Sequence, residues 1–230
     1  MRLALMQPYF FPYIGYFELV AGVDKFILYD DASYSKNSWY NRNRVLSATK
    51  AFEYIRVAVS NEKLGTAVRE VRATNKEQDL NRTLSVCAVY KRAPYYTSVL
   101  DLIRDTFHNS SDGLADIAGK SVILTSEYLG FKTTFQNSSQ IAYDRSGSAE
   151  QKVISVCKAS RATEYVNLSG GKHLYLETNF NEAGLELSFS PPSTFRYDEG
   201  PHRETEFLSI IDTLMFCSPL EIRSYIELRT

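Results

Sequence analysis

The chain contains 230 residues with 26 basic and 27 acidic side chains, which gives a formal net charge of -1. This balance argues against a protein that coats nucleic acid, although it allows a local basic pocket. No apolar run approaches the roughly 18 residues that a membrane span needs, and the apolar start is too short for a signal peptide. The three cysteines lie far apart, so we expect reduced thiols and a cytoplasmic protein.

Aromatic residues are concentrated near the start of the chain. There are 16 Tyr, 13 Phe and 1 Trp, and 11 of these lie in the first 40 residues. More than a third of the aromatic side chains therefore fall in less than a fifth of the chain. The same segment holds polar residues suited to ligands, so some of these rings are predicted to line a cleft while others belong to the core.

The first 30 residues predict a strand, a loop, a helix and a second strand. Residues 2–6 form an apolar run, and the prolines within residues 7–12 exclude a helix there. A helix is expected over residues 13–21, because a proline suits its start. Residues 25–29 form a second apolar run, and a strand–helix–strand unit of this length indicates parallel strands.

The middle of the chain predicts short strands followed by helices. Residues 41–47 and 52–60 are expected to pair as strands across a polar turn, and a third short strand is expected at residues 68–72. Apolar residues three and four apart then predict helices over residues 80–107, with a break at an internal proline, and over residues 114–129.

The second half alternates strands with helices. Strands are predicted at residues 132–138, 165–168 and 185–189, and helices at residues 149–162, 174–183, 207–216 and 220–228. Such alternation is typical of a parallel sheet, so we expect a mainly parallel, Rossmann-like sheet with helices on both faces and a C-terminal helix pair. The chain is predicted to be a single α/β domain, residues 1–230, with a helical segment at about 80–130 inserted between its two halves.

The loop at residues 7–12 is the first candidate site, because open parallel sheets bind ligands at the carboxyl ends of their strands. Gln7 offers an amide group, Gly15 allows a ligand to approach the backbone closely, and the helix N-terminus attracts anions. The alternative is a loop whose aromatic side chains only pack into the core.

Two more strand ends carry chemically useful residues. The adjacent carboxylates of Asp30 and Asp31 suit a metal ion, sugar hydroxyls or a general base, or else one caps a turn and the other is solvated. The run Ser169-Gly170-Gly171 presents backbone N–H groups that suit phosphate or carboxylate, and an ordinary tight turn is the alternative.

A basic segment follows the Asp pair. Residues 36–44 hold three cations, no acid and the single Trp of the chain. Along a strand, Arg42 and Arg44 share one face while Asn41 and Asn43 take the other. Two adjacent guanidinium groups suit a diphosphate, because each can bind oxygens bidentately. The alternative is a solvated edge hairpin.

Other catalytic motifs are not found in the sequence. The three histidines have no metal-like spacing, and there is no Gly-x-Ser-x-Gly elbow, P-loop, Gly-x-Gly-x-x-Gly or Cys-x-x-Cys motif. We therefore expect no metal site, no tightly bound cofactor, and no covalent serine or cysteine catalysis.

The candidate motifs together resemble the WbqC-like family of bacterial proteins. The residues that carry the resemblance are Gln7-Pro8, Phe11 to Phe17, Asp24-Lys25-Phe26, Asp30-Asp31, Trp39-x-Asn41-Arg42-Asn43-Arg44, Ala93-Pro94-Tyr95-Tyr96 and Ser169-Gly170-Gly171 with Tyr175. The resemblance extends over nearly the whole chain. It implies a protein encoded in clusters for O-antigen (lipopolysaccharide) and related bacterial surface glycans.

The order of the first elements also resembles the opening of class I nucleotidyltransferase-type folds, such as that of pantothenate synthetase. Those enzymes carry a His-x-Gly-His box, and the corresponding residues here are Tyr13-Ile14-Gly15-Tyr16. The two imidazoles neutralise the charge that develops on phosphate in adenylyl transfer. Their replacement by tyrosines disfavours ATP chemistry even if the fold is shared.

These observations lead to the hypothesis of a transferase that N-acylates or N-aminoacylates an amino sugar on a nucleotide carrier, by direct attack of the amine. Asp30 or Asp31 is expected to accept the amine proton, and the backbone of Gly170 and Gly171 to stabilise the oxyanion. The diphosphate is assigned to Lys36, Arg42 and Arg44, and stacking on base or sugar to Tyr9, Tyr16, Tyr34 and Trp39. The other predicted ligand-binding residues are Gln7, Gly15, Asn43, Ser169 and His173.

Two alternatives remain at the level of sequence. One is a glycosyltransferase of the same pathway, in which the Asp pair holds a metal ion. The other is a non-catalytic sugar- or glycan-binding protein. The expected partners are a nucleotide-linked sugar and, for acyl transfer, an acyl or aminoacyl donor, with no nucleic acid.

Overall fold

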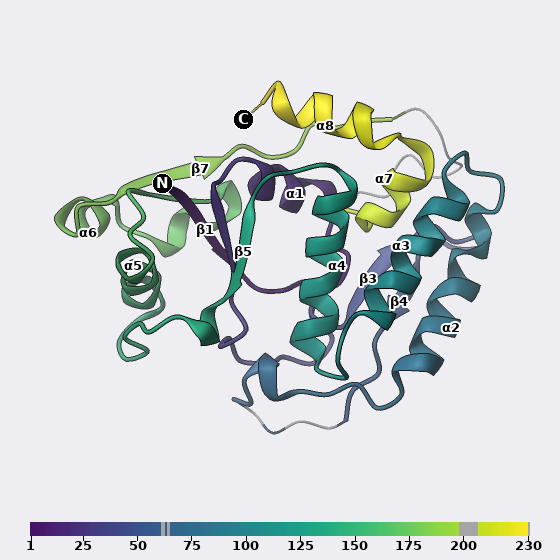
Figure 1. Ribbon diagram of the computed structural model, residues 1–230, viewed down its shortest axis with the longest axis horizontal. Coiled ribbons are helices and arrows are strands. Elements are labelled where there is room, and N and C mark those ends of the chain that lie inside the picture. The colour runs from purple at the N-terminus through teal and green to yellow at the C-terminus, as the bar shows by residue number, and fades with distance from the viewer. Residues whose placement is uncertain (61–62, 64, 198–206, 230) are drawn as a thin grey trace.

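The computed structural model describes residues 1–60, 63, 65–197 and 207–229, and a five-stranded sheet lies at its centre (Figure 1). The strands are β1 (Arg2–Met6), β2 (Lys25–Leu28), β5 (Thr134–Asn137), β6 (Glu164–Leu168) and β7 (Glu186–Ser190). Each neighbouring pair is parallel, and the spatial order is β5-β2-β1-β6-β7. The predicted parallel sheet is confirmed.

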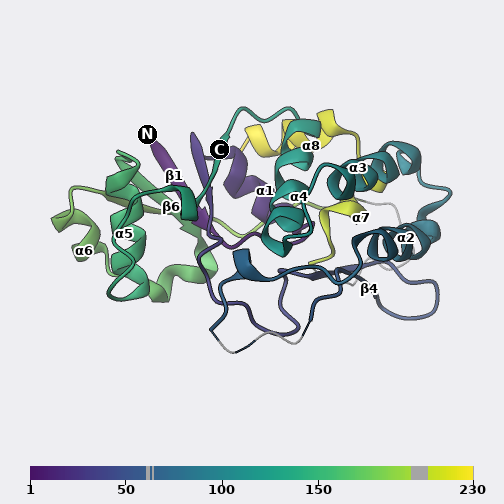
Figure 2. The same cartoon turned by 60° about the horizontal axis from the view of Figure 1, so that its bottom comes forward.

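Helices cover both faces of this sheet (Figures 1 and 2). One face carries α5 (Ala149–Ala159) and α6 (Glu177–Glu182), and the other carries α1 (Ile14–Ala21) and α4 (Leu114–Tyr128). The remaining helices are α2 (Lys76–Cys87) and α3 (Tyr96–His108), which continue the layer of α4, and the C-terminal pair α7 (Ile210–Phe216) and α8 (Pro219–Glu227). Of the described helices the longest, α4, has 15 residues, and none combines the length and apolar character that a membrane span needs.

The central strands supply side chains to two separate cores. Leu3 and Leu5 pack into the cluster on the α5 side, whereas Ala4 packs into the larger cluster on the α1 and α4 side. Ile27 and Phe26 of β2 divide between the clusters in the same way. Because successive strand residues point to opposite faces and both faces are covered, these strands are apolar after their first residues, Arg2 and Lys25.

A second, two-stranded sheet contains the basic segment. Its strands β3 (Arg42–Val45) and β4 (Glu53–Arg56) are antiparallel, which confirms the predicted strand pair. Asn43 is buried, while Arg42 and Arg44 on the opposite face are partly exposed. The alternation expected for a strand therefore holds here.

The strand predicted at residues 68–72 is wrong, since Val68–Glu70 forms a 3-10 turn. The first two amides of this turn donate to the carbonyl groups of Ala32 and Asp30, at 2.8 and 3.1 Å. Those hydrogen bonds attach the turn to the chain just after β2, so its backbone has no ladder to join.

The neighbouring strands β1 and β6 send the chain in opposite directions. From β1 it continues through α1 to β2, and from β6 through α6 to β7 at the far edge. Strands that diverge in this way leave a crevice at their carboxyl ends, where open α/β sheets bind ligands. The topology therefore directs attention to the ends of β1 and β6.

Candidate functional site

A cavity of about 650 Å³ lies at the carboxyl ends of β1 and β6. Met6 lines it from the end of β1 and Gln7 from the loop that follows. Asn167 and Leu168 line it from β6, and Ala149 lines it from the first turn of α5. Cavities of roughly 300–1,000 Å³ are typical of small-molecule sites. The crevice that the topology predicts is therefore present and large enough for a ligand.

The cavity wall combines aromatic, amide and aliphatic side chains, the last from Leu5, Met6, Pro12, Ala149, Val153, Leu168 and Leu174. Its rings are Tyr9, Tyr13, Tyr29, Trp39, Tyr175 and Phe207, its amides are Gln7, Asn43 and Asn167, and its glycines are Gly170 and Gly171. Among the described residues that line it, Arg44 is the one with a charged side chain. This composition suits a ligand that combines an anionic group with flat or hydroxyl-rich parts.

The structure brings together only part of the predicted set. The predicted residues that line the cavity are Gln7, Tyr9, Trp39, Asn43, Arg44, Gly170 and Gly171. The predicted residues outside its lining are Gly15, Asp30, Asp31, Tyr16, Tyr34, Lys36, Arg42, Ser169 and His173. The first group comes from the strand ends β1 and β6 and from β3, which face the same crevice.

The loop after β1 is fixed by hydrogen bonds from distant segments. The Asn43 side-chain amide donates to the carbonyl groups of Phe10 and Phe11 at 3.0 and 2.9 Å. The hydroxyl of Ser121 accepts from the Phe11 N–H at 2.8 Å, and that of Ser209 donates to the Phe11 carbonyl at 2.7 Å. Phe11 has a φ of 42°, a conformation that costs on the order of 1–3 kcal/mol and persists where its surroundings enforce it.

Two of the predicted stacking residues belong to the core instead. Tyr16 is fully buried, and its hydroxyl donates to the Gln7 carbonyl at 2.8 Å, so it supports the loop from beneath. Tyr34 is 8% exposed and packs in the same large core. Tyr9, in contrast, lines the cavity and donates to the side-chain oxygen of Gln7 at 2.5 Å.

Gly15 lies outside the cavity lining and leaves room for a neighbouring ring. A Cβ atom placed on Gly15 would lie 2.5 Å from the ring of Tyr13, which folds back over the first turn of α1. Only a residue without a side chain leaves room for that ring. The glycine therefore places Tyr13, a residue with no predicted binding role, in the cavity wall.

Asp30 is enclosed by the residues that follow β5. Its carboxylate accepts hydrogen bonds from the Ser138 hydroxyl and the Ser139 N–H, both at 2.9 Å, and from the Ser139 hydroxyl at 2.6 Å. The residue is 3% exposed. A carboxylate with this many donors is held in place and has little capacity left for a substrate.

Asp31 is enclosed in the same region. It forms ion pairs with Arg69 and with Arg145, the latter at 3.3 Å, and accepts a hydrogen bond from the Tyr143 hydroxyl at 2.9 Å. Its side chain is 8% exposed. Neither Asp30 nor Asp31 lines the cavity, so the cavity gives no support to their prediction as the general base of a reaction there.

The two arginines of β3 have different surroundings. The Arg44 guanidinium lies 5.4 Å from the Trp39 ring centroid and donates to the Phe207 carbonyl at 3.3 Å. That of Arg42 lies 4.5 Å from the Tyr54 ring centroid and is outside the cavity lining. Of the three cations predicted to hold a diphosphate, Arg44 is the one within the described lining of the cavity.

The end of β6 is shaped by Asn167, which is 5% exposed. Its side-chain amide donates to the Tyr175 hydroxyl at 3.1 Å, and its oxygen accepts from the Leu168 N–H at 2.7 Å. A Cβ atom on Gly171 would lie 3.1 Å from the Asn167 nitrogen, so a small residue suits that position. These contacts hold Tyr175 against the cavity.

The residues after Gly171 differ from the prediction. Ser169–Leu174 forms a 3-10 helix, so the helix predicted over residues 174–183 begins only at Glu177. His173 is exposed and outside the cavity lining, and so is Lys36 near β3. The 3-10 helix directs the His173 side chain to solvent rather than to the cavity.

Burial sets the protonation of the cavity tyrosines. It is the main cause that raises the pKa of Tyr9, Tyr13, Tyr29 and Tyr175 above the usual value of 10.0. Their hydroxyl groups therefore stay protonated at neutral pH and act as hydrogen-bond donors rather than as bases.

Several cavity residues had no predicted binding role. Those with an aromatic or amide side chain are Tyr13, Tyr29, Asn167, Tyr175 and Phe207. Tyr29 and Asn167 lie beside motifs that the sequence does mark, the Asp pair and the Ser-Gly-Gly run, so their positions at strand ends were a usable signal. Phe207 comes from the far end of the chain, and no local pattern connects it to β1 or β6.

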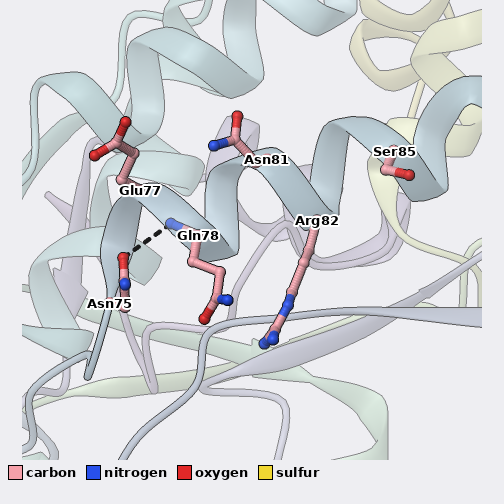
Figure 3. A pocket seen from close by; sticks show the side chains of 6 residues that line it. All are labelled: Asn75, Glu77, Gln78, Asn81, Arg82 and Ser85. Carbon is pink, nitrogen blue, oxygen red and sulfur yellow. Dashed lines mark hydrogen bonds between the residues drawn. The ribbon is translucent and has the colours of Figure 1, made fainter.

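A second cavity, of about 430 Å³, lies along α2 (Figure 3). Its lining residues are Asn75, Glu77, Gln78, Asn81, Arg82 and Ser85. All six are exposed, and they come from one helix and its N-cap. The Asn75 side chain is occupied in capping, since it accepts from the Gln78 N–H at 3.0 Å. This cavity is a groove on the helix surface, without groups converging from different elements.

Comparison with known proteins agrees with the motifs at the cavity. The sequence profile of the WbqC-like protein family matches residues 7–224. An uncharacterized protein of Mycobacterium tuberculosis strain H37Rv, Rv1507c, is 25% identical over 199 residues, which cover 86% of this chain and 83% of that protein. No solved structure shows significant similarity to the chain. The profile match extends from the loop after β1 to α8, and the chain therefore belongs to the WbqC-like protein family.

Proposed function

We propose that the protein is a transferase of bacterial surface-glycan biosynthesis that acylates or aminoacylates an amino sugar on a nucleotide carrier. The observation that carries this proposal is the cavity at the ends of β1 and β6, with its aromatic rings, three amides and Arg44. Rings suit a base or a sugar face, amides suit sugar hydroxyls, and a guanidinium suits a phosphate. Membership of the WbqC-like family supports the surface-glycan setting.

The proposed reaction needs no nucleophile from the protein. The amine nitrogen attacks the acyl carbonyl carbon, a C–N bond forms, and the bond from that carbon to the sulfur of a thioester donor breaks. The departing thiolate takes up the proton that the nitrogen loses. The Tyr175 hydroxyl and the backbone N–H groups of Gly170 and Gly171 are the donors available to the carbonyl oxygen as it gains negative charge.

The substrate amine is proposed to enter the cavity uncharged. The described lining residues include no carboxylate or imidazole that would remove a proton from an ammonium group. The protonated tyrosines fit this arrangement, because they donate hydrogen bonds without competing for the amine proton. The three cysteines are buried free thiols, which supports a reducing, cytoplasmic setting.

The test is amide formation measured by mass spectrometry, with UDP- or dTDP-linked amino sugars and acyl or aminoacyl thioesters as substrates. Arg44→Ala should raise KM for the nucleotide sugar roughly 10- to 100-fold, because a hydrogen bond to a charged group is lost. Arg42→Ala, on the same strand face but outside the cavity, is the matched control and should change KM less than about threefold. Equal effects of the two substitutions, or no product from any substrate pair, would reject the proposal.

One observation favours a second candidate, a non-catalytic sugar-binding protein. Within the described lining, the rings and amides suit a sugar, and no carboxylate or imidazole is present. Calorimetry separates the two candidates, since tight binding of free glycan without preference for a nucleotide would support the second. The cavity gives no support to the glycosyltransferase alternative, because the Asp pair that would hold its metal ion lies outside the lining.

A further inference from the structure

Two exposed aromatic side chains flank the cavity. Among the large apolar side chains that the described structure leaves exposed, Trp39 and Phe207 are the aromatic ones, with 37% and 60% of their surface accessible. Both line the cavity. Exposed rings at the mouth of a concave site are a common platform for ligands, whereas single exposed apolar residues elsewhere on a surface need no explanation.

A cation lies beside both aromatic residues. The Arg44 guanidinium is 5.4 Å from the Trp39 ring centroid, and it donates to the Phe207 carbonyl at 3.3 Å. The Phe207 ring also packs edge-on against Tyr13, with ring centroids 5.4 Å apart. The mouth therefore presents flat apolar surfaces and a positive charge within one small area.

The position of Phe207 is enforced by its surroundings. Its φ of 57° lies in the left-handed region, which is strained for a bulky residue. The next residues are tied down, because the Ser209 N–H donates to the Arg44 carbonyl at 2.8 Å and the Ser209 hydroxyl donates to the Phe11 carbonyl at 2.7 Å. A strained backbone that keeps an apolar ring exposed at a cavity is a feature found at functional sites.

We propose that Trp39 and Phe207 form a nucleobase subsite, in which the base of the carrier stacks on these rings while its phosphate contacts Arg44. This inference rests on the proposed function for the presence of a nucleotide carrier, and it assigns the carrier's orientation. In a nucleotide the flat base is joined through a sugar to phosphate, which matches two exposed rings in a cavity wall that also holds a guanidinium. A polyprenyl diphosphate supplies phosphate and an aliphatic chain but no flat ring system, and a free sugar supplies no negative charge for Arg44.

The chain carries a built-in probe for this subsite, because Trp39 is its single Trp. Stacking of a base on the indole should quench its fluorescence. We expect saturable quenching by at least one of UMP, dTMP, GMP, CMP and AMP, and stronger binding by the corresponding diphosphate. The amino sugar alone and farnesyl diphosphate should quench far more weakly. Failure of all five nucleotides, or stronger binding of farnesyl diphosphate, would overturn the subsite.

Variants of Phe207 separate stacking from a general effect on the fold. Phe207→Ala should weaken nucleotide binding roughly 5- to 150-fold, the range expected for one lost base–ring contact. Phe207→Tyr keeps a ring and should bind within about threefold of wild type. Leu220→Ala removes an equally exposed apolar side chain from α8, outside the cavity, and should bind as wild type does. Unchanged binding by Phe207→Ala would contradict the proposal.

The outcomes also distinguish this inference from the proposed function. Nucleotide quenching that depends on Phe207, without amide formation, would keep the subsite and reject the proposed reaction. Amide formation from a nucleotide sugar, with no effect of Phe207→Ala on its KM or on quenching, would keep the reaction and reject the subsite.

Discussion

The carboxyl ends of β1 and β2 are alike in sequence character and different in what they become. The two strands are neighbours, both are apolar and parallel, and each is followed by residues suited to bind a ligand. After β1 the chain lines a cavity with Gln7 and Tyr9. After β2 the carboxylates of Asp30 and Asp31 are enclosed by serine, tyrosine and arginine side chains.

The difference arises because β1 and β2 each have a second neighbouring strand, and these two neighbours continue in different ways. β1 borders β6, and the connections that follow these two strands run in opposite directions, so the space beyond the strand ends remains open. β2 borders β5, whose end turns directly into Ser138–Gln140 beside the two acids. The same kind of strand end therefore becomes a ligand cavity or a structural network according to where its neighbour's connection runs.

The largest expected effect comes from removing a carboxylate from the network at the end of β2. Asp31→Ala leaves Arg69 and Arg145 without their shared carboxylate. It should lower the free energy of unfolding by about 2–4 kcal/mol. This is somewhat less than for a fully buried ion pair, because both arginines are partly exposed. Asp101→Ala removes an exposed partner of Arg104 and should cost at most about 1 kcal/mol. Urea denaturation of both variants measures the difference.

The comparison fails if Asp31 has a role in the cavity. In that case Asp31→Asn would abolish nucleotide-sugar binding or transfer while the protein kept wild-type stability. We expect the reverse, a loss of stability with nearly unchanged binding at temperatures where the variant is folded.

A smaller effect is expected at the cavity beyond β1, where Gly15 makes room for Tyr13. Gly15→Ala should destabilise the protein by about 1–2 kcal/mol and weaken ligand binding, because the new Cβ displaces the Tyr13 ring. In a Tyr13→Ala background the same substitution should be neutral or stabilising by up to about 1 kcal/mol, as alanine favours a helix. A double-mutant cycle measures this, and additive effects would show that the contact does not shape the cavity.

The smallest expected effect concerns pH and a third enclosed carboxyl, that of Asp212. The residue is 4% exposed, accepts from the Tyr90 hydroxyl at 2.6 Å and from that of Tyr197, and burial raises its pKa above 3.8. A carboxyl whose pKa is raised by folding contributes most below its unfolded pKa, and that contribution is lost as pH rises through the folded value.

Asp212→Asn should therefore flatten the decline in unfolding free energy as the pH is raised above about 4. Burial also raises the pKa of Glu18 and Asp79, so part of the decline should remain. Asp144 is the control of opposite sign, because hydrogen bonds from Ser146 lower its pKa and its contribution is lost as pH falls. Parallel stability–pH curves for wild type and Asp212→Asn would show that this carboxyl is not penalised by burial.

Sequence alone determined the layers of this protein and its family. Apolar runs, prolines and helical spacing placed the five sheet strands and most helices, because those signals are local and both faces of the sheet are covered. The same local rules failed at residues 68–72, where the backbone donates to carbonyl groups brought from the end of β2 rather than to a strand.

Only the tertiary structure decided which candidate residues share a site. Asp30, Arg42 and Tyr16 have the chemistry of binding residues. In the structure, however, Asp30 accepts from serines that follow β5, Arg42 lies against the Tyr54 ring, and Tyr16 is buried in the core. Phe207 enters the cavity wall through contacts with Arg44 and Tyr13, which lie far away along the chain. The sequence shows which chemical groups a residue carries, but its partners depend on which distant segments the fold places beside it.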